Sequence, residues 1–153
     1  MTGGSGAISV EDMGTDINDI SLTTTGTISL DGTYTTSILS SGNADVGDVT
    51  LTGPVTLAGN TTIDTDSTSN NGAVTFTSTV DGAKTLTITS GSGAVQFGGN
   101  IGATTALGDV TVNSSAGTGT ITFSGNVGAD ATTAGAAVVT VCLLYTSDAA
   151  DEP

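Results

Sequence analysis

Apolar and polar residues alternate through most of the chain, in short runs that end at glycine or asparagine. Residues 95–103 and 121–129 repeat one phrase: branched aliphatic, polar, Phe, small residue, Gly, Asn, branched aliphatic, Gly and Ala. Alternation with period two predicts a strand with one buried face, and Gly-Asn is typical of the turn that ends it. Internal repetition at this distance predicts stacked units.

The phrase aligns without gaps with two earlier runs, at residues 55–60 and 74–80. The third aligned position is then occupied by Leu57, Phe76, Phe97 and Phe123, at intervals of 19, 21 and 26 residues. All three phenylalanines of the chain thereby share one position of the repeat. We expect these four side chains to stack in one column.

A second apolar-Thr-apolar run follows three of these phrases. The runs are Leu86-Thr-Ile88, Val110-Thr-Val112 and Val139-Thr-Val141, and Ile63 is their counterpart in the first unit. Earlier in the chain, residues 20–22, 28–30 and 48–53 show the same alternation, and Asp31-Gly32 predicts a turn. Constant spacing within strands, with variable segments between them, is typical of stacked repeats.

These patterns predict an all-β fold, a parallel β-solenoid (a right-handed β-helix) with irregular coils of about 19–26 residues, because stacked coils bury in a common core the apolar face that one coil cannot bury alone. We expect a frayed edge or partial coil at residues 1–19, solenoid repeats at 20–141, and a non-native tail at 142–153. The side chains expected to point outward are Thr56, Thr75, Thr87, Gln96, Thr111, Thr122 and Thr140. Asn60, Asn100 and Asn126 are expected to share one turn of successive coils and to bond along the stack, with Thr79 interrupting the row.

The composition supports strands over helices. The chain is 36% hydrophobic and 3% aromatic, with 23 glycines, and Thr, Val and Ile favour strands. Lys84 is the only basic residue and the formal net charge is -14, so we expect no recognition of a phosphate backbone. We expect no transmembrane helix and no signal peptide in this stretch, and we place the export signal of an exported parent protein upstream.

The last residues break the pattern. The string CLLYTSDAADE, which begins at Cys142, resembles the in-frame translation of a sequencing-library adapter. This resemblance implies a fragment of a longer reading frame from environmental sequencing, whose only cysteine is not native. The rest of the chain then carries 12 acidic residues and one Lys.

Little in the sequence supports catalysis. The chain has no His and no Arg, and Cys142 is its only Cys, which excludes Ser-His-Asp and Cys-His triads and His- or Cys-based zinc sites. Asp64 and Asp66 could form an acid pair or a weak calcium site, but calcium needs six to eight oxygen ligands, so we expect a solvated loop. Lys84 is expected to offset neighbouring acids. We therefore expect no catalytic, metal or cofactor site.

Residues 55–141 resemble the β-strand repeats of very long bacterial surface proteins, including filamentous-haemagglutinin-like adhesins and autotransporter passenger domains. The resemblance rests on residues 93–102, GAVQFGGNIG, and on the Leu/Val-Thr-Ile/Val strands. It implies a non-enzymatic structural or adhesive shaft segment of a large exported protein, secreted or at the bacterial cell surface. Implied partners are cell-surface or matrix glycans or proteins and neighbouring coils of a longer chain; nucleic acid and membrane insertion are not implied.

Two alternative functions are considered. A carbohydrate-active β-helix could be a polysaccharide lyase or a phage tailspike-like glycosidase; a single Lys counts against a lyase, whereas a two-carboxylate glycosidase is compatible with the composition. An ice-binding solenoid is suggested by the Thr-x-Thr phrases at residues 50–52, 85–89 and 120–122. The unequal repeat intervals, and Gln96 in the outward row, count against it.

Overall fold

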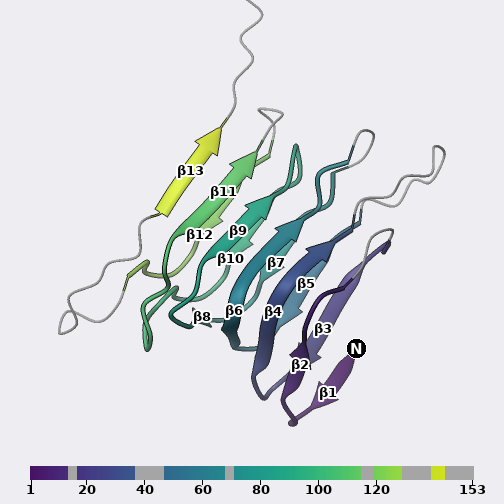
Figure 1. The fold of residues 1–153 in the computed structure, drawn as a ribbon, viewed down its shortest axis with the longest axis vertical. Helices are drawn as coiled ribbons and strands as arrows, with labels where there is room; N and C mark the ends of the chain where they lie inside the picture. The colour runs from purple at the N-terminus through teal and green to yellow at the C-terminus, as the bar shows by residue number, and fades with distance from the viewer. Residues whose placement is uncertain (14–16, 37–46, 68–70, 115–118, 129–138, 144–153) are drawn as a thin grey trace, which may run out of the picture.

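The computed structural model describes residues 1–13, 17–36, 47–67, 71–114, 119–128 and 139–143. Every regular element in these ranges is a β-strand, and they contain no helix long and apolar enough to cross a membrane. The strands form two parallel sheets that face each other, with the chain passing from one to the other and back (Figure 1). The fold is a parallel β-solenoid of about four turns, as the repeats predict.

Each rung of the solenoid contributes one strand to each sheet, and the strands of successive rungs lie side by side along the solenoid axis. Sheet A has the order β1 (Thr2–Gly4), β3 (Ile20–Thr24), β5 (Val49–Thr52), β7 (Val74–Phe76), β10 (Val95–Phe97) and β12 (Ile121–Phe123). Sheet B has the order β2 (Ile8–Val10), β4 (Ile28–Thr35), β6 (Val55–Asp64), β9 (Leu86–Thr89), β11 (Val110–Ser114) and β13 (Val139–Leu143), with β8 (Val80–Asp81) paired to the start of β6. Each strand therefore pairs with its counterparts in neighbouring coils.

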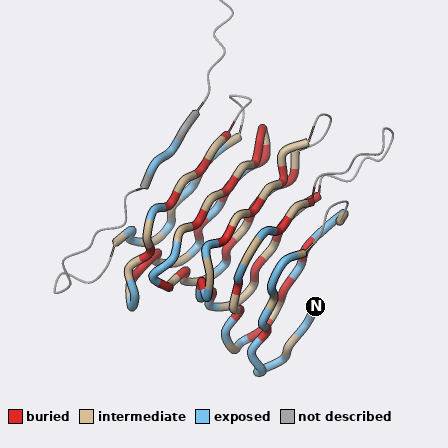
Figure 2. Tube along the Cα trace, in the orientation of Figure 1, coloured by how far each residue is buried: buried red, intermediate tan, exposed pale blue. Residues whose placement is uncertain are grey.

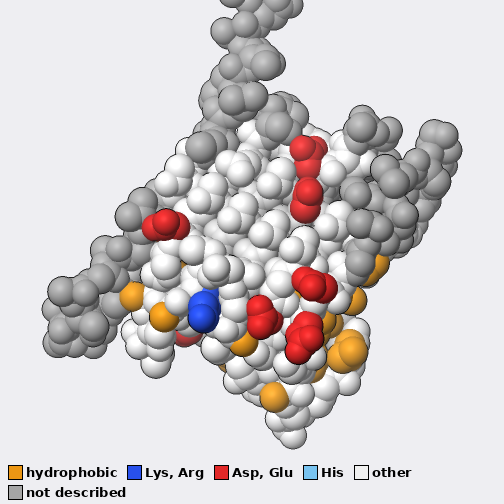
Figure 3. Space-filling model, viewed as in Figure 1, with side chains coloured by type: hydrophobic (Ala, Val, Ile, Leu, Met, Phe, Trp, Pro, Cys, Tyr) orange, Lys and Arg blue, Asp and Glu red, His pale blue; other side chains and the backbone are white. Residues whose placement is uncertain are grey.

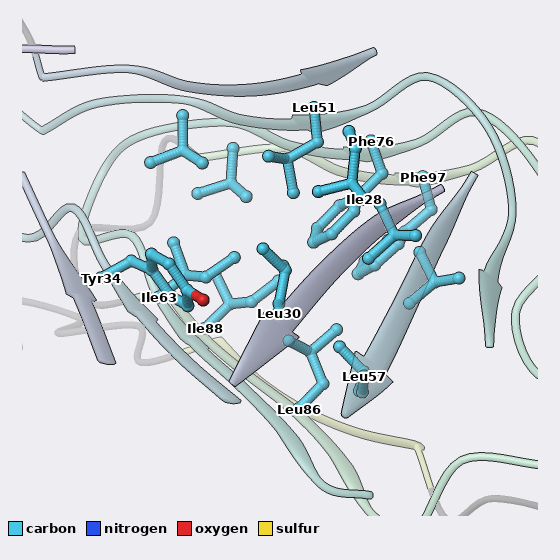
Figure 4. Close-up of a cluster of buried hydrophobic side chains, with 14 of the residues drawn as sticks. Ile28, Leu30, Tyr34, Leu51, Leu57, Ile63, Phe76, Leu86, Ile88 and Phe97 are labelled. Atoms are coloured by element: carbon cyan, nitrogen blue, oxygen red, sulfur yellow. The ribbon is translucent and has the colours of Figure 1, made fainter. Parts of the chain in front are cut away.

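The three phenylalanines form a continuous stack along the solenoid, and Figure 4 shows two of them, Phe76 and Phe97, side by side. Phe76 pairs in register with Phe97, and Phe97 with Phe123. The ring centroids are 5.0 Å apart in both pairs, with interplanar angles of 6° and 3°. This spacing is close to the separation of about 4.7–4.9 Å between paired strands, so each ring lies over the ring of the preceding rung. The predicted column is confirmed for these three residues.

The fourth member of the column is not Leu57, and that prediction was wrong. Phe76 pairs with Leu51, and Leu51 pairs with Leu22. Leu57 lies in β6 of sheet B and pairs with Leu30. Residues 49–51 and 55–57 have the same apolar-Thr-apolar pattern, so alternation alone does not reveal the sheet to which each belongs. From β3 to β12, the separations in sequence between successive paired strands of sheet A are accordingly 29, 25, 21 and 26 residues.

Gly53 makes the corner that separates these two look-alike strands. Its φ is 136°, a conformation that residues with a Cβ rarely adopt. A Cβ at this position would also collide with the carbonyl oxygen of Thr24 in the preceding rung. The chain can therefore leave sheet A and enter sheet B within two residues, Gly53 and Pro54.

The predicted second strands are confirmed in register. Ile63 pairs with Ile88, which pairs with Val112, which in turn pairs with Val141. The prediction of a turn at Asp31-Gly32 was wrong, because β4 continues through it with a local shift of register. The positive φ of Gly32, 102°, accommodates the irregularity within the strand.

Burial alternates along the strands as the period of two predicts (Figure 2). The core is made of branched aliphatic and aromatic residues from both sheets, whereas none of the seven side chains predicted to point outward is buried. Residues 1–19 include β1 and β2, which pair with β3 and β4. At the other end, β13 continues to Leu143, and Cys142 pairs with Asn113; residues 144–153 lie outside the described residues.

The Phe stack generates a prediction. We expect Phe97→Ala to lower the free energy of unfolding by about 3–5 kcal/mol, because it removes both ring contacts and leaves a cavity. Phe97→Leu keeps most of the volume and should cost less than half as much. Denaturant unfolding followed by circular dichroism measures both. The neighbouring outward residue supplies the control: Gln96→Ala should change stability by no more than about 0.5 kcal/mol, and an equal loss for Gln96→Ala and Phe97→Ala would contradict the stack.

Candidate functional site

Aspartate and asparagine side chains at the corners bond to backbone N–H groups of the next rung. The acceptor and donor pairs are Asp12 Oδ1 with Thr33 N (2.6 Å), Asp19 Oδ1 with Asp48 N (2.9 Å), Asp48 Oδ1 with Ala73 N (2.8 Å), Asn60 Oδ1 with Thr85 N (3.2 Å), and Asn100 Oδ1 with Asn126 N (3.0 Å). Asp81 Oδ1 accepts from both Thr104 N (2.8 Å) and Thr105 N (3.1 Å). In every pair the acceptor belongs to the earlier rung and the donor to the later one.

These bonds give the predicted asparagines a structural role. Asn100 and Asn126 occupy the same corner in successive rungs and bond along the stack, as predicted. Asn60 lies within β6, where the register shifts between Leu57 and Thr61, so its assignment to the same turn was wrong. Its Oδ1 accepts from Thr85 N, directly before β9 of the next rung. Its alignment followed from that of Leu57. The aspartates of this set were not predicted, although Asp19 and Asp48 directly precede branched aliphatic residues that begin strands.

A second corner is built from buried hydroxyl groups and glycines. Thr36, Thr65 and Ser90 directly follow successive strands of sheet B, and Ser114 is the last residue of the next one, β11. Each of the four is at most 1% exposed. The hydroxyls of three of them donate to backbone carbonyls: Thr36 to Gly47, Thr65 to Gly72, and Ser114 to Gly91. Ser90 Oγ has no hydrogen-bond partner among the described residues.

The glycines that open the next strand of sheet A belong to this corner. They are Gly47, Gly72, Gly93 and Gly119, each two residues before the first aliphatic residue of its strand. A Cβ on Gly93 would collide with the carbonyl oxygen of Gly72. The chain therefore leaves sheet B and re-enters sheet A at fixed points, whatever the length between them. Residues 37–46, 68–70 and 115–118, which lie between such points, are outside the described residues.

The outward face of sheet B carries an unbroken row of threonines. The row consists of Thr33, Thr62, Thr87, Thr111 and Thr140, each the register partner of the next. The equivalent row of sheet A is mixed: Ser21, Thr50, Thr75, Gln96 and Thr122. Figure 3 shows the sheet B face as a broad area of uncharged atoms with separate acidic side chains around it. Gln96 therefore interrupts one outward row but not the other.

Asp64 and Asp66, which the sequence offers as an acid pair, are linked through a backbone hydrogen bond. Asp64 Oδ1 accepts a hydrogen bond from Asp66 N at 3.1 Å, and both residues are partly buried. No group of three or more His, Cys, Asp or Glu residues in the described ranges is arranged to hold a metal ion. Lys84 is exposed on the segment between β8 and β9.

Among the residues that the structure describes, Tyr34 is the only titratable side chain in the core. Its hydroxyl donates to the carbonyl oxygen of Val10 (2.6 Å) and accepts from Asp31 N (3.1 Å). Burial raises the pKa of Tyr34 above its usual value of 10.0, and the negative charges of Asp31, Asp12 and Glu11 add to the increase, while a backbone hydrogen bond from Asp31 opposes it. The position of Tyr34 after an apparent turn hid this role in the sequence.

Comparison with known proteins found no family model, no curated protein and no solved structure that matches the chain. The fold, its corners and its outward faces are therefore the basis for inferring a function.

Tyr34 generates a prediction about alkaline stability. The pKa of Tyr34 is raised in the folded state. The contribution of Tyr34 to the free energy of unfolding is therefore complete below pH 10, and it is lost as the pH rises toward the pKa of the folded state. Tyr34→Phe should lower the free energy of unfolding by about 1–2 kcal/mol at neutral pH, since two hydrogen bonds are lost. The difference between the two proteins should narrow above pH 10. Urea unfolding of both proteins from pH 7 to pH 11 measures this difference in stability. A difference that stays constant over this range would refute the raised pKa of Tyr34.

Proposed function

We propose that the chain is a segment of a non-enzymatic structural or adhesive shaft of a large exported surface protein. The observation that carries the proposal is the continuous core, in which columns of like residues run through successive rungs of both sheets. A repeat architecture of this kind is quasi-one-dimensional, so each added coil lengthens the molecule without changing its cross-section. Such a body is suited to holding a binding region away from a surface.

The corners support the same proposal. Fixed exit and entry points, such as Thr65 and Gly72, allow connections of different length without a shift in the stacked strands. Loops that vary on a constant scaffold are where recognition residues concentrate in proteins. The shaft would present such loops to glycans or proteins of cell surfaces or matrices. The resemblance of residues 55–141 to adhesin repeats agrees with this role.

If the shaft is rigid, the distances between two labels near its ends should fall in a narrow distribution. Spin labels at Ser5→Cys and Ser124→Cys, both exposed, with Cys142→Ser as background, should give one narrow distribution by pulsed electron paramagnetic resonance. Its width should match that of a pair within one rung, because the axial spacing is held at about 4.8 Å per rung. A broad distribution, like that of the same protein in denaturant, would contradict a rigid shaft.

The absence of catalysis is tested separately. The chain, incubated with acidic and neutral polysaccharides, should release neither new reducing ends nor unsaturated sugars. Release that disappears in Asp64→Asn but not in Thr56→Ala would favour the carbohydrate-active alternative.

The threonine row favours ice binding as a second candidate. Unequal coil lengths leave this row unbroken because the extra residues are accommodated at the corners, and the five threonines from Thr33 to Thr140 remain register partners. A regular, uncharged array of hydroxyl and methyl groups is the surface that would order water into a lattice. Among the described residues, sheet A lacks such an array because of Gln96.

If this second candidate is right, the protein should show thermal hysteresis and inhibit ice recrystallisation. Thr87→Lys, at the centre of the row, should abolish both effects, since a charged side chain disrupts the array. Thr75→Lys places the same charge on sheet A and should leave both intact. Equal effects of the two substitutions, or no activity in the parent protein, would exclude an ice-binding face on sheet B.

A further inference from the structure

The chain contains a single Asn-Gly pair, Asn71-Gly72, at the corner where it passes from β6 to β7. An asparagine followed by glycine is especially prone to spontaneous deamidation, because glycine has no Cβ to shield its backbone nitrogen from the preceding carboxamide. Every other asparagine of the chain precedes a residue with a Cβ. Asn71 is half-buried and Gly72 is buried, so the structure around them controls whether the pair can react.

Hydrogen bonds hold both reacting groups of this pair. Asn71 Oδ1 accepts from Ser67 N (2.6 Å), and Asn71 Nδ2 donates to Ser92 Oγ in the next rung (2.9 Å). Gly72 N donates to the carbonyl oxygen of Thr65 (3.2 Å), and Gly72 O accepts from Thr65 Oγ1 (2.7 Å). The carbon that would be attacked and the nitrogen that would attack it are therefore both held in place, and the contact with Ser92 links them to the next rung.

Deamidation at this pair consumes only water. Gly72 N loses its proton to water and forms a bond to Asn71 Cγ; the bond from Cγ to Nδ2 breaks, which releases ammonia and closes a five-membered succinimide ring. Water then opens the ring at one of its two carbonyl groups and leaves aspartate or isoaspartate. The intramolecular attack is fast only when the two atoms can approach each other, and the hydrogen bonds of the corner oppose that approach.

The aspartate product would place two like charges together. A Cβ added to Gly91 would collide with both Asp66 Oδ1 and Asn71 Nδ2, so these two side chains lie over the same residue of the next rung. A carboxylate at position 71 would face the carboxylate of Asp66, and like charges at short distance repel. An ionised carboxylate also has no proton to donate to Ser92 Oγ.

The isoaspartate product would move the backbone itself. Its main chain runs through one additional carbon before Gly72, so Gly72 could not keep its place against Thr65. A Cβ added to Gly93 would collide with Gly72 O, which shows that the corner of the next rung packs directly on this carbonyl group. Either product would therefore loosen the contact between two successive rungs.

We propose that Asn71 is a site of spontaneous deamidation, which reacts only when the corner between β6 and β7 separates from the next rung. Local opening of this kind exposes groups that the folded state protects. Each reaction leaves a permanent negative charge beside Asp66 and makes further opening easier, so the corner records the age of the scaffold. The proposal goes beyond the shaft and ice-binding functions, because it depends only on the scaffold.

The first test compares rates of deamidation during incubation in mildly alkaline buffer, followed by peptide mapping with mass spectrometry. Asn71 of the folded parent protein should react about tenfold more slowly, or less, than Asn71 of the protein unfolded in denaturant. Ser92→Ala removes the acceptor of Asn71 Nδ2 and should raise the rate in the folded protein by about threefold or more. The control Ser124→Ala, at an exposed position, should leave the rate unchanged.

Further variants separate protection by the hydroxyl from a general loss of fold. Ser92→Thr keeps the hydroxyl and should restore protection. Circular dichroism establishes that each variant keeps its β-type spectrum; if Ser92→Ala does not, Ser92→Cys replaces it, because sulfur is a weak hydrogen-bond acceptor. Equal rates at Asn71 in the folded and unfolded parent protein would overturn the proposal. A folded Ser92 variant without the hydroxyl whose Asn71 reacts no faster than that of the parent would also overturn it.

The second test measures the effect of the product on the corner. Asn71→Asp reproduces the aspartate product and should lower the urea midpoint more than Asn126→Asp, which adds the same charge at an exposed position. Added salt should reduce the difference between these two proteins, and Asp66→Asn in the Asn71→Asp protein should remove most of it. Equal midpoints for Asn71→Asp and Asn126→Asp, or a difference that Asp66→Asn leaves intact, would overturn the proposed repulsion.

Discussion

The parallel, in-register hydrogen bonding between rungs is the constraint on which the rest of the structure depends. Most strands contain only three to five residues, too few to be stable alone. Pairing in register places like residues over one another, so one ladder produces the aromatic stack, the aliphatic columns and the outward threonine row. A slip of one residue in any strand would exchange its buried and exposed faces. The core and the surface are therefore two results of the same pairing.

The corners make this pairing compatible with coils of unequal length. At one corner, buried hydroxyls bond to glycine carbonyls, as Thr65 does to Gly72. At other corners, carboxylate or amide oxygens accept from the next rung, as Asp48 does from Ala73. Both devices satisfy backbone groups where the ladder is interrupted, and unsatisfied buried groups there would be costly. Sequence separations of 20 to 29 residues between paired strands thus coexist with a regular stack.

The sequence predicts strands well and their assignment to sheets less well. Alternation identifies which side chains are buried, and the phenylalanine spacing identifies the stack from Phe76 to Phe123. Alternation does not distinguish residues 49–51 from residues 55–57, which share the same pattern although they belong to different sheets. The two segments are separated by the corner at Gly53. Because Leu57 was assigned to the wrong sheet, Asn60 was assigned to the wrong turn. The sequence predicts Thr87, Thr111 and Thr140 as outward residues of aligned strands. The extension of this row to Thr33 and Thr62 was missed, since these two are neighbours only once the register of sheet B is known.

The corner bonds that run from each rung to the next also constrain how such a chain can change over generations. Because each acceptor serves a donor one full coil later, duplication or loss of a whole coil joins equivalent corners and preserves the pattern. Loss of half a coil would bring a strand of one sheet against the corner of the other. Copy number is therefore a variable that recombination can adjust in integral steps, and molecular length becomes an inheritable trait that can vary while the cross-section stays the same.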